Sequence, residues 1–222
     1  MKMEISRLQL AGMLAKQLNT FFPGERNISG RDLLGYLDLT LARLQSCFIQ
    51  MRDKAFCLDG VARFDCQHTD QYAMFLYLFG RTVFESGNRS DIQLAKKAYA
   101  LNKALHALDA FYEIELPEAF LFVHAVGTVL GRAQYGNYFV VYHGCTVGAD
   151  GEKKPRIGDG VVMFGHSAII GNSHVERDSA MGYGSVARNF HVSSCKVVHG
   201  QSPHNAVVTA KEKYLKRFFI IP

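Results

Sequence analysis

The sequence predicts an α + β protein of two parts, a helical N-terminal domain and a solenoid of short parallel strands. Two observations lead to this prediction. The first is a hydrophobic pattern with helical spacing over roughly the first 112 residues. The second is a six-residue repeat from Val123 to Ala187, which fits neither the period of an α-helix nor the alternation of an ordinary strand. We expect a helical domain at 1–112, a repeat domain at 113–205 and a tail at 206–222.

The N-terminal domain is predicted to be all helical. Leu33, Leu37 and Leu41 recur at helical spacing on one face of the second helix. The third helix is almost continuously apolar, so we expect it to be buried among the others. A capping-box pattern beginning at Ser90 opens the fourth. The expected helices span residues 4–20, 31–52, 70–86 and 90–111.

The repeat predicts a solenoid in which an apolar residue heads each unit and points into a stacked core. A small residue follows most heads by four positions and fits the corners, where glycines permit tight backbone turns. A polar stretch at 149–156 interrupts the series and is expected to form a loop outside the core. Beyond Ala187 the pattern fades. The predicted heads are Val123, Val129, Tyr135, Val141, Val147, Ile157, Met163, Ile169, Val175, Met181 and Ala187.

Composition narrows the class of protein. Of the 222 residues, 48% are hydrophobic and 20% charged, as in a folded soluble domain. The chain has neither a signal-peptide pattern nor an apolar run long enough to span a membrane. Its five cysteines are odd in number and lack a CxxC pair, which favours a reducing, cytoplasmic setting. The net charge of +5 accompanies no nucleic-acid-binding motif.

Histidines are the notable polar residues of the repeat. His124 stands at its start, and an imidazole that titrates near neutrality suits removal of a proton from a hydroxyl. Such a base needs a partner on its other ring nitrogen. Glu115, Glu113 and Asp109 lie upstream and are the candidates.

Five segments carry a resemblance to a known family: 123–131, the loop ending at Pro155, 157–172, 180–186 and 200–203. Together they resemble bacterial serine O-acetyltransferases. The resemblance covers roughly residues 113–205 and implies a left-handed β-helix, a homotrimer, and acetyl-CoA as the acetyl donor.

The resemblance also implies roles for residues. His124 would be the general base, with Glu115 as the first choice for the acid that orients it. Lys211 or Lys213 would reach the phosphates of CoA. The pantetheine arm would lie along the corners at Gly165, Ser167, Gly182, Gly184 and Ser185.

Two departures from the family concern the acceptor. Val123 stands where family members carry an aspartate that binds the serine amino group, and Lys154 stands where they carry a histidine. We therefore expect an uncharged acceptor, a sugar or a surface-polysaccharide unit, contacted by Lys154, Val123 and His143, with His166 as a further candidate. Serine O-acetylation for cysteine biosynthesis is the alternative.

Two further classes stay open. A zinc-dependent lyase of the γ-carbonic-anhydrase kind needs three converging imidazoles, and only His199 and His204 are suitably spaced, beyond the clear repeat. No metal site is therefore expected. A catalytically silent scaffold that only binds partners is the other class.

Overall fold

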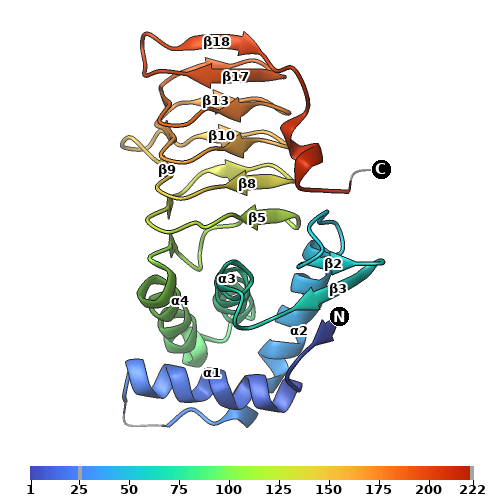
Figure 1. Ribbon diagram of the computed structural model, residues 1–222. Coiled ribbons are helices and arrows are strands. Elements are labelled where there is room, and N and C mark those ends of the chain that lie inside the picture. Colours follow the sequence, from blue (N-terminus) through green and yellow to red (C-terminus); the bar gives the residue numbers. More distant parts are fainter. Residues whose placement is uncertain (25–26, 221–222) are drawn as a thin grey trace.

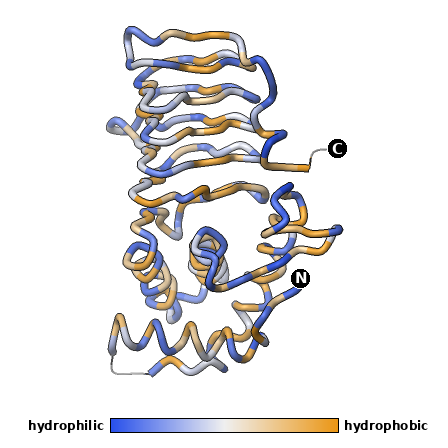
Figure 2. The backbone as a smooth tube through the Cα atoms, in the orientation of Figure 1, coloured by the Kyte–Doolittle hydropathy of each residue, from blue (hydrophilic) through white to orange (hydrophobic). Residues whose placement is uncertain are grey.

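The computed structural model describes residues 1–24 and 27–220. It consists of a helical region with a strand-built solenoid stacked on it (Figure 1). Hydrophobic residues recur along the solenoid strands, whereas the loop after β9 is hydrophilic (Figure 2). None of the described helices combines the length and apolar content needed to cross a membrane.

Four helices form the N-terminal region. Capping boxes begin the first two, at Ser6 with Gln9 and at Ser29 with Asp32. The third is buried on nearly all sides, as predicted, and lies beneath β5 (Figure 1). The fourth ends at His106, five residues short of the expected end near Phe111, and its C-cap Ala107 adopts a left-handed conformation. The helices are α1 (Arg7–Phe21), α2 (Gly30–Phe48), α3 (Thr69–Glu85) and α4 (Ile92–His106), with a 3-10 turn η1 (Arg89–Asp91) before α4.

The prediction of an all-helical N-terminal domain was incomplete. A three-stranded sheet, ordered β1-β3-β2, packs beside α2. Asp59 and Gly60, both with positive φ, form the hairpin turn between two of its strands. An Asp-Gly pair is a hairpin signal that the helical interpretation passed over. The strands are β1 (Lys2–Met3), β2 (Cys57–Leu58) and β3 (Val61–Phe64).

The solenoid has three parallel sheets, one on each face. One sheet contains β7 (Gln134–Tyr135), β10 (Arg156–Ile157), β13 (His174–Val175) and β16 (His191–Val192). The second contains β5 (Phe120–Phe122), β8 (Phe139–Val141), β11 (Val162–Met163), β14 (Ala180–Met181) and β17 (Lys196–His199), with β18 (Ala206–Thr209) added antiparallel. The third contains β4 (Asp109–Ala110), β6 (Val129–Leu130), β9 (Thr146–Gly148), β12 (Ala168–Ile170) and β15 (Val186–Arg188). We call these the β7, β5 and β4 sheets.

The predicted heads from Val141 to Ala187 are all buried. The first two heads were wrong. Phe122 pairs with Val141 and Leu130 pairs with Val147, so these residues, and not Val123 and Val129, continue the interior columns. The interval from Phe122 to Leu130 is longer than a regular unit, and the extra residues form an irregular corner.

The solenoid also continues past the predicted end. Val192 and Val198 are fully buried and extend the interior columns into β16 and β17. The interval between Ala187 and Val192 is one residue short, and this shortening concealed the continuation.

The expected tail is ordered over its described part. After β18 the chain runs back along the solenoid to a 3-10 turn, η2 (Tyr214–Arg217), toward the helical region (Figure 1). Leu215 and Phe219 are buried, and Phe219 forms an antiparallel bridge with Met51. Residues 221–222 of the predicted tail lie outside the described residues.

Candidate active site

His124 lies in the irregular corner after β5. Its backbone has a φ of 48°, a left-handed conformation that is uncommon for a residue with a side chain. The side chain is 80% exposed. An imidazole held at a solvent-facing corner is available to a substrate.

Asp70 holds this corner in place. It lies in the first turn of α3, where the helix dipole favours a carboxylate, and it is nearly buried. The backbone N–H of His124 donates to Oδ1 and Oδ2 of Asp70, at 3.0 and 3.1 Å. Oδ2 also lies 3.5 Å from Nδ1 of the His124 ring. The carboxylate therefore fixes the backbone of His124 and places a negative charge beside its ring.

A pocket opens beside this pair. Nδ1 of His68 is buried there and has no hydrogen-bond partner among the described residues. Arg52 and Arg217 also line this pocket. Nε of Arg52 donates a hydrogen bond to the carbonyl of Phe219, and the guanidinium of Arg217 forms an ion pair with Glu212. The lining residues are Arg52, Asp53, Phe56, His68, Asp70, Leu121, Phe122, Val123, His124, Arg217 and Phe218. We call this space the His124 pocket.

The upstream acids chosen from the sequence lie elsewhere within the chain. Glu115 is 84% exposed and lies 3.7 Å from Arg81. Glu113 lies 3.4 Å from Arg132. Asp109 accepts hydrogen bonds from Tyr99 and Lys103 at 2.7 and 2.6 Å. The expected Glu115–His124 pair is therefore corrected to Asp70–His124.

Asp70 was missed because it precedes His124 by 54 residues. The sequence predicted that Asp70 lies near the start of a helix. It did not predict that this helix packs beneath β5. Arg52 and Arg217 were missed as pocket residues for the same reason.

Val123 lines the His124 pocket, but Lys154 does not. Lys154 is exposed in the loop after β9, in a second groove that also contains Glu115. The loop follows β9 and the His124 corner precedes β6, so they lie at opposite ends of the parallel strands of the β4 sheet. One chain thus divides the predicted acceptor residues between two places.

His143 belongs to a column of aromatic side chains along the corner between the β5 and β4 sheets. Its ring centroid lies 5.0 Å from that of His166, which lies 5.3 Å from that of Tyr183. A Cβ on Gly165 would come within 2.7 Å of Nε2 of His143, so the ring covers this glycine. His143 is not among the residues that line the His124 pocket.

The expected cofactor residues differ in accessibility. Ser167 and Ser185 are fully buried, because their hydroxyls face the solenoid interior, and the expectation that they contact a cofactor was wrong for these side chains. Gly182 is covered, since a Cβ there would come within 2.8 Å of Nδ1 of His199. Gly184 faces open space, and Lys211 is exposed.

A helical region followed by a three-faced solenoid of six-residue units defines the class of hexapeptide-repeat β-helix proteins. Within that class, the chain is similar in sequence to serine acetyltransferases. It is 28% identical over 136 residues to that of Mycobacterium tuberculosis, which is 59% of this chain and 54% of the relative. It is 27% identical over 103 residues to that of Synechococcus elongatus, which is 44% of this chain and 42% of the relative. The chain therefore spans about half the length of the curated relatives it matches. No protein-family model matches it.

Solved structures agree on the fold. Serine acetyltransferase from Neisseria gonorrhoeae superposes with a TM-score of 0.67 at 20% identity, covering 94% of this chain and 82% of that one. A serine acetyltransferase solved with CoA gives 0.65 at 20% identity, covering 90% and 83%. The predicted order, a helical region followed by the β-helix of the family, is confirmed.

Proposed function

We propose that the protein is an acetyl-CoA-dependent O-acetyltransferase and that serine, rather than a sugar, is its acceptor. The observation that carries this proposal is the Asp70–His124 pair at a pocket bordered by Arg52 and Arg217. The sequence similarity to serine acetyltransferases supports the same choice.

His124 is the general base. It takes the proton from the acceptor hydroxyl as the oxygen attacks the thioester carbonyl of acetyl-CoA, and CoA leaves as the thiol. Asp70 supports this step, because a carboxylate beside the ring stabilises the imidazolium that forms.

The charges around the pocket support serine. The argument for a sugar was that Val123 leaves no carboxylate for an ammonium group. Asp70, contributed by α3, supplies a carboxylate that lines the same pocket. Arg52 and Arg217 border the pocket with positive charge, which suits a carboxylate. A free amino acid carries both charges, and a neutral sugar carries neither.

Acetyl-CoA as donor is supported by the resemblance and by the fold shared with a serine acetyltransferase solved with CoA. The corner at Gly184 has open space in which a pantetheine arm could lie, and Lys211 is exposed toward solvent for a phosphate contact. The free cysteines, including the buried Cys47 and Cys145, fit the reducing cytoplasm that we propose as the compartment.

A closed trimer fits the division of residues between the two ends of the strands of the β4 sheet. In a threefold ring, a surface on one side of each subunit contacts a different surface of the next subunit. We place the Lys154 loop of one subunit beside the His124 pocket of its neighbour. Mixing His124→Ala and Lys154→Ala subunits tests this, because mixed trimers should regain activity that neither variant has. If the mixture stays inactive while co-purification through a tag carried by only one variant confirms mixed trimers, shared sites are excluded.

The acceptor is tested directly. Purified protein with acetyl-CoA is assayed for free thiol with serine, a neutral hexose and an amino sugar. We expect turnover with serine that falls by about a hundredfold or more in His124→Ala and is retained in His204→Ala, the matched control on an exposed turn. Turnover with the hexose and none with serine would restore the sugar assignment. Turnover with neither, at saturating acetyl-CoA, would favour a scaffold.

A further inference from the structure

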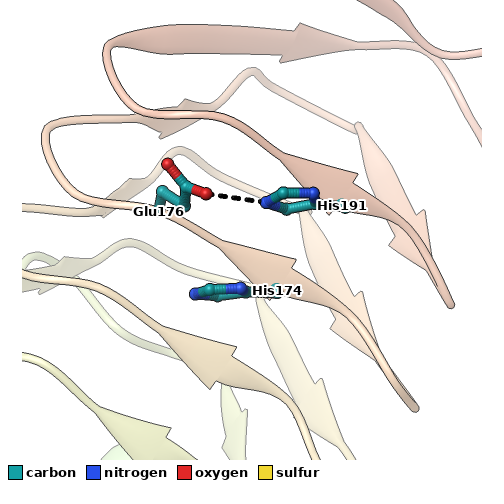
Figure 3. Close-up of side chains that lie close together, drawn as sticks. All are labelled: His174, Glu176 and His191. Carbon is teal, nitrogen blue, oxygen red and sulfur yellow. Dashed lines mark hydrogen bonds and ion pairs between the residues drawn. The ribbon is translucent and has the colours of Figure 1, made fainter.

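A column of polar side chains runs up the outer surface of the β7 sheet, far from the His124 corner. Gln134, Arg156, His174 and His191 occupy matching positions on consecutive strands, and their strand neighbours Ile157, Val175 and Val192 point inward. At the top of the column, the His174 and His191 rings are stacked with centroids 5.2 Å apart and planes inclined by 12° (Figure 3). The repeat thus places two imidazoles from successive coils side by side.

Glu176 completes a cluster with these rings. It follows His174 by two residues, which returns its side chain to the same face. Its Oε1 lies 2.8 Å from Nε2 of His191 (Figure 3). Its Oε2 accepts from the backbone N–H and the hydroxyl of Ser194, at 3.0 and 2.7 Å.

These contacts keep the carboxylate oriented. Ser194 binds one oxygen and leaves the other directed at the imidazoles. A carboxylate oriented by an outer hydrogen-bond donor is the arrangement found around metal ligands.

We propose that His174, Glu176 and His191 bind a divalent transition-metal ion of the zinc class. Two imidazoles and a carboxylate are a ligand set that Zn²⁺ accepts, with a remaining position for water. Their candidate ligand atoms all lie within 4.8 Å of one another. Tetrahedral zinc separates its ligand atoms by about 3.3 Å. Because each nitrogen lone pair lies in the plane of its ring, the two stacked imidazoles must turn out of their parallel arrangement for both to reach one ion, which then replaces the His191–Glu176 hydrogen bond. The side chains of His191 and Glu176 are 61% and 33% exposed, which leaves room for these rotations.

The position of the site indicates what the ion does. His174 and Glu176 belong to the coil of β13, and His191 belongs to the next coil at β16. A bound ion therefore cross-links consecutive coils near the end of the solenoid. Arg156 occupies the adjacent place in the column, and its positive charge opposes the ion.

Binding is measured on tag-free protein stripped with chelator, by calorimetric titration with zinc chloride alone. We expect one equivalent to bind, with affinity at least tenfold weaker in His174→Gln, His191→Gln and Glu176→Gln. His204→Gln, an exposed histidine outside the cluster, is the matched control and should bind as the wild type does. Ser194→Ala should weaken binding by about 10–100-fold, since it removes only the outer support, and Arg156→Gln should tighten it.

A second readout separates the site from a simple ion pair. At a zinc concentration near one hundred times Kd, the melting temperature should rise by about 5–10 °C in the wild type and in His124→Ala, but not in His191→Gln. Circular dichroism confirms that each variant is folded. The proposal would be overturned if the wild type failed to bind one equivalent of zinc. It would also be overturned if the folded His174→Gln and His191→Gln variants bound zinc as tightly as the wild type does.

Discussion

The backbone N–H of His124 donates to both carboxylate oxygens of Asp70, at 3.0 and 3.1 Å, across the junction between the solenoid and α3. This pair joins the two parts of the molecule at the candidate active site. Asp70 is nearly buried, whereas the ring of His124 is exposed. The helical region thus supports the base through its backbone and leaves the imidazole accessible.

Replacing His124 by alanine removes the proposed general base. We expect kcat for acetyl transfer to fall by about 10²–10⁴-fold. The melting temperature should change little, because the ring is 80% exposed. Steady-state kinetics with a thiol readout measures the loss, and His204→Ala controls for substitution of an exposed histidine. Unchanged turnover would remove His124 from the mechanism.

Asp70→Asn keeps a hydrogen-bond acceptor for the His124 backbone but removes the charge beside its ring. We expect kcat to fall by about tenfold or more, with a much smaller change in KM. A purely structural role would instead reduce the melting temperature and leave kcat per folded molecule unchanged. Measuring both quantities on the same variant distinguishes the two roles.

Arg217→Gln removes one positive charge from the border of the His124 pocket. If Arg217 binds the serine carboxylate, KM for serine should rise by about tenfold or more, with a much smaller change in kcat. KM for acetyl-CoA should stay constant. Lys216→Gln, the neighbouring exposed cation, is the matched control. Equal effects of both substitutions would indicate a general charge effect.

Glu176 predicts acid-sensitive stability in the metal-free protein. Its pKa in the fold is lowered from 4.5 to about 2 by Ser194 and His191. Because the folded pKa is depressed, this contribution is fully present above pH 4.5 and is lost as the pH falls toward 2. Between pH 6 and pH 3, the wild type should therefore lose more melting temperature than Glu176→Gln. Parallel pH curves for the two proteins would contradict this.

Two glycines should respond to alanine in opposite directions. A Cβ on Gly131 would lie 2.6 Å from the carbonyl oxygen of Val147, which belongs to the backbone of the next coil and cannot easily move. We expect Gly131→Ala to lower the free energy of unfolding by about 1–3 kcal/mol. Gly35 is exposed within α2 and has nothing within 4 Å of the added Cβ, so Gly35→Ala should raise it by about 0.5–1 kcal/mol. Denaturant titration measures both.

Local periodicity predicted most of the fold. The helical spacing of Leu33 and Leu37 and the six-residue repeat after Val141 depend on neighbours in the sequence, and the structure confirms both. The predictions failed where one unit changed length, at the His124 corner and after Ala187. There the interior column continues through Phe122, Leu130 and Val192 in altered spacing.

The site was less predictable, because its partners come from separate elements. His124 was identified from its own segment. Asp70 approaches it only because α3 packs under β5, and Arg217 only because the C-terminal segment returns along the solenoid. No spacing rule connects positions so far apart. Buried Ser167 shows the converse, since its motif position was found but the direction of its side chain was not.

The strap formed by residues 218–220 affects how the molecule unfolds. Arg52 donates a backbone hydrogen bond to Phe218 at 2.8 Å, and Ile220 donates one to Gln50 at 2.7 Å. A solenoid whose coils contact only their neighbours can fray from its free end one coil at a time. Here the chain that follows β18 is anchored by these hydrogen bonds to residues just after α2. The last coils therefore cannot unfold without breaking contacts with the helical region. Helical and strand signals should therefore disappear together in one cooperative transition. Replacing Phe219 by alanine, which removes its buried ring, should separate them into two transitions.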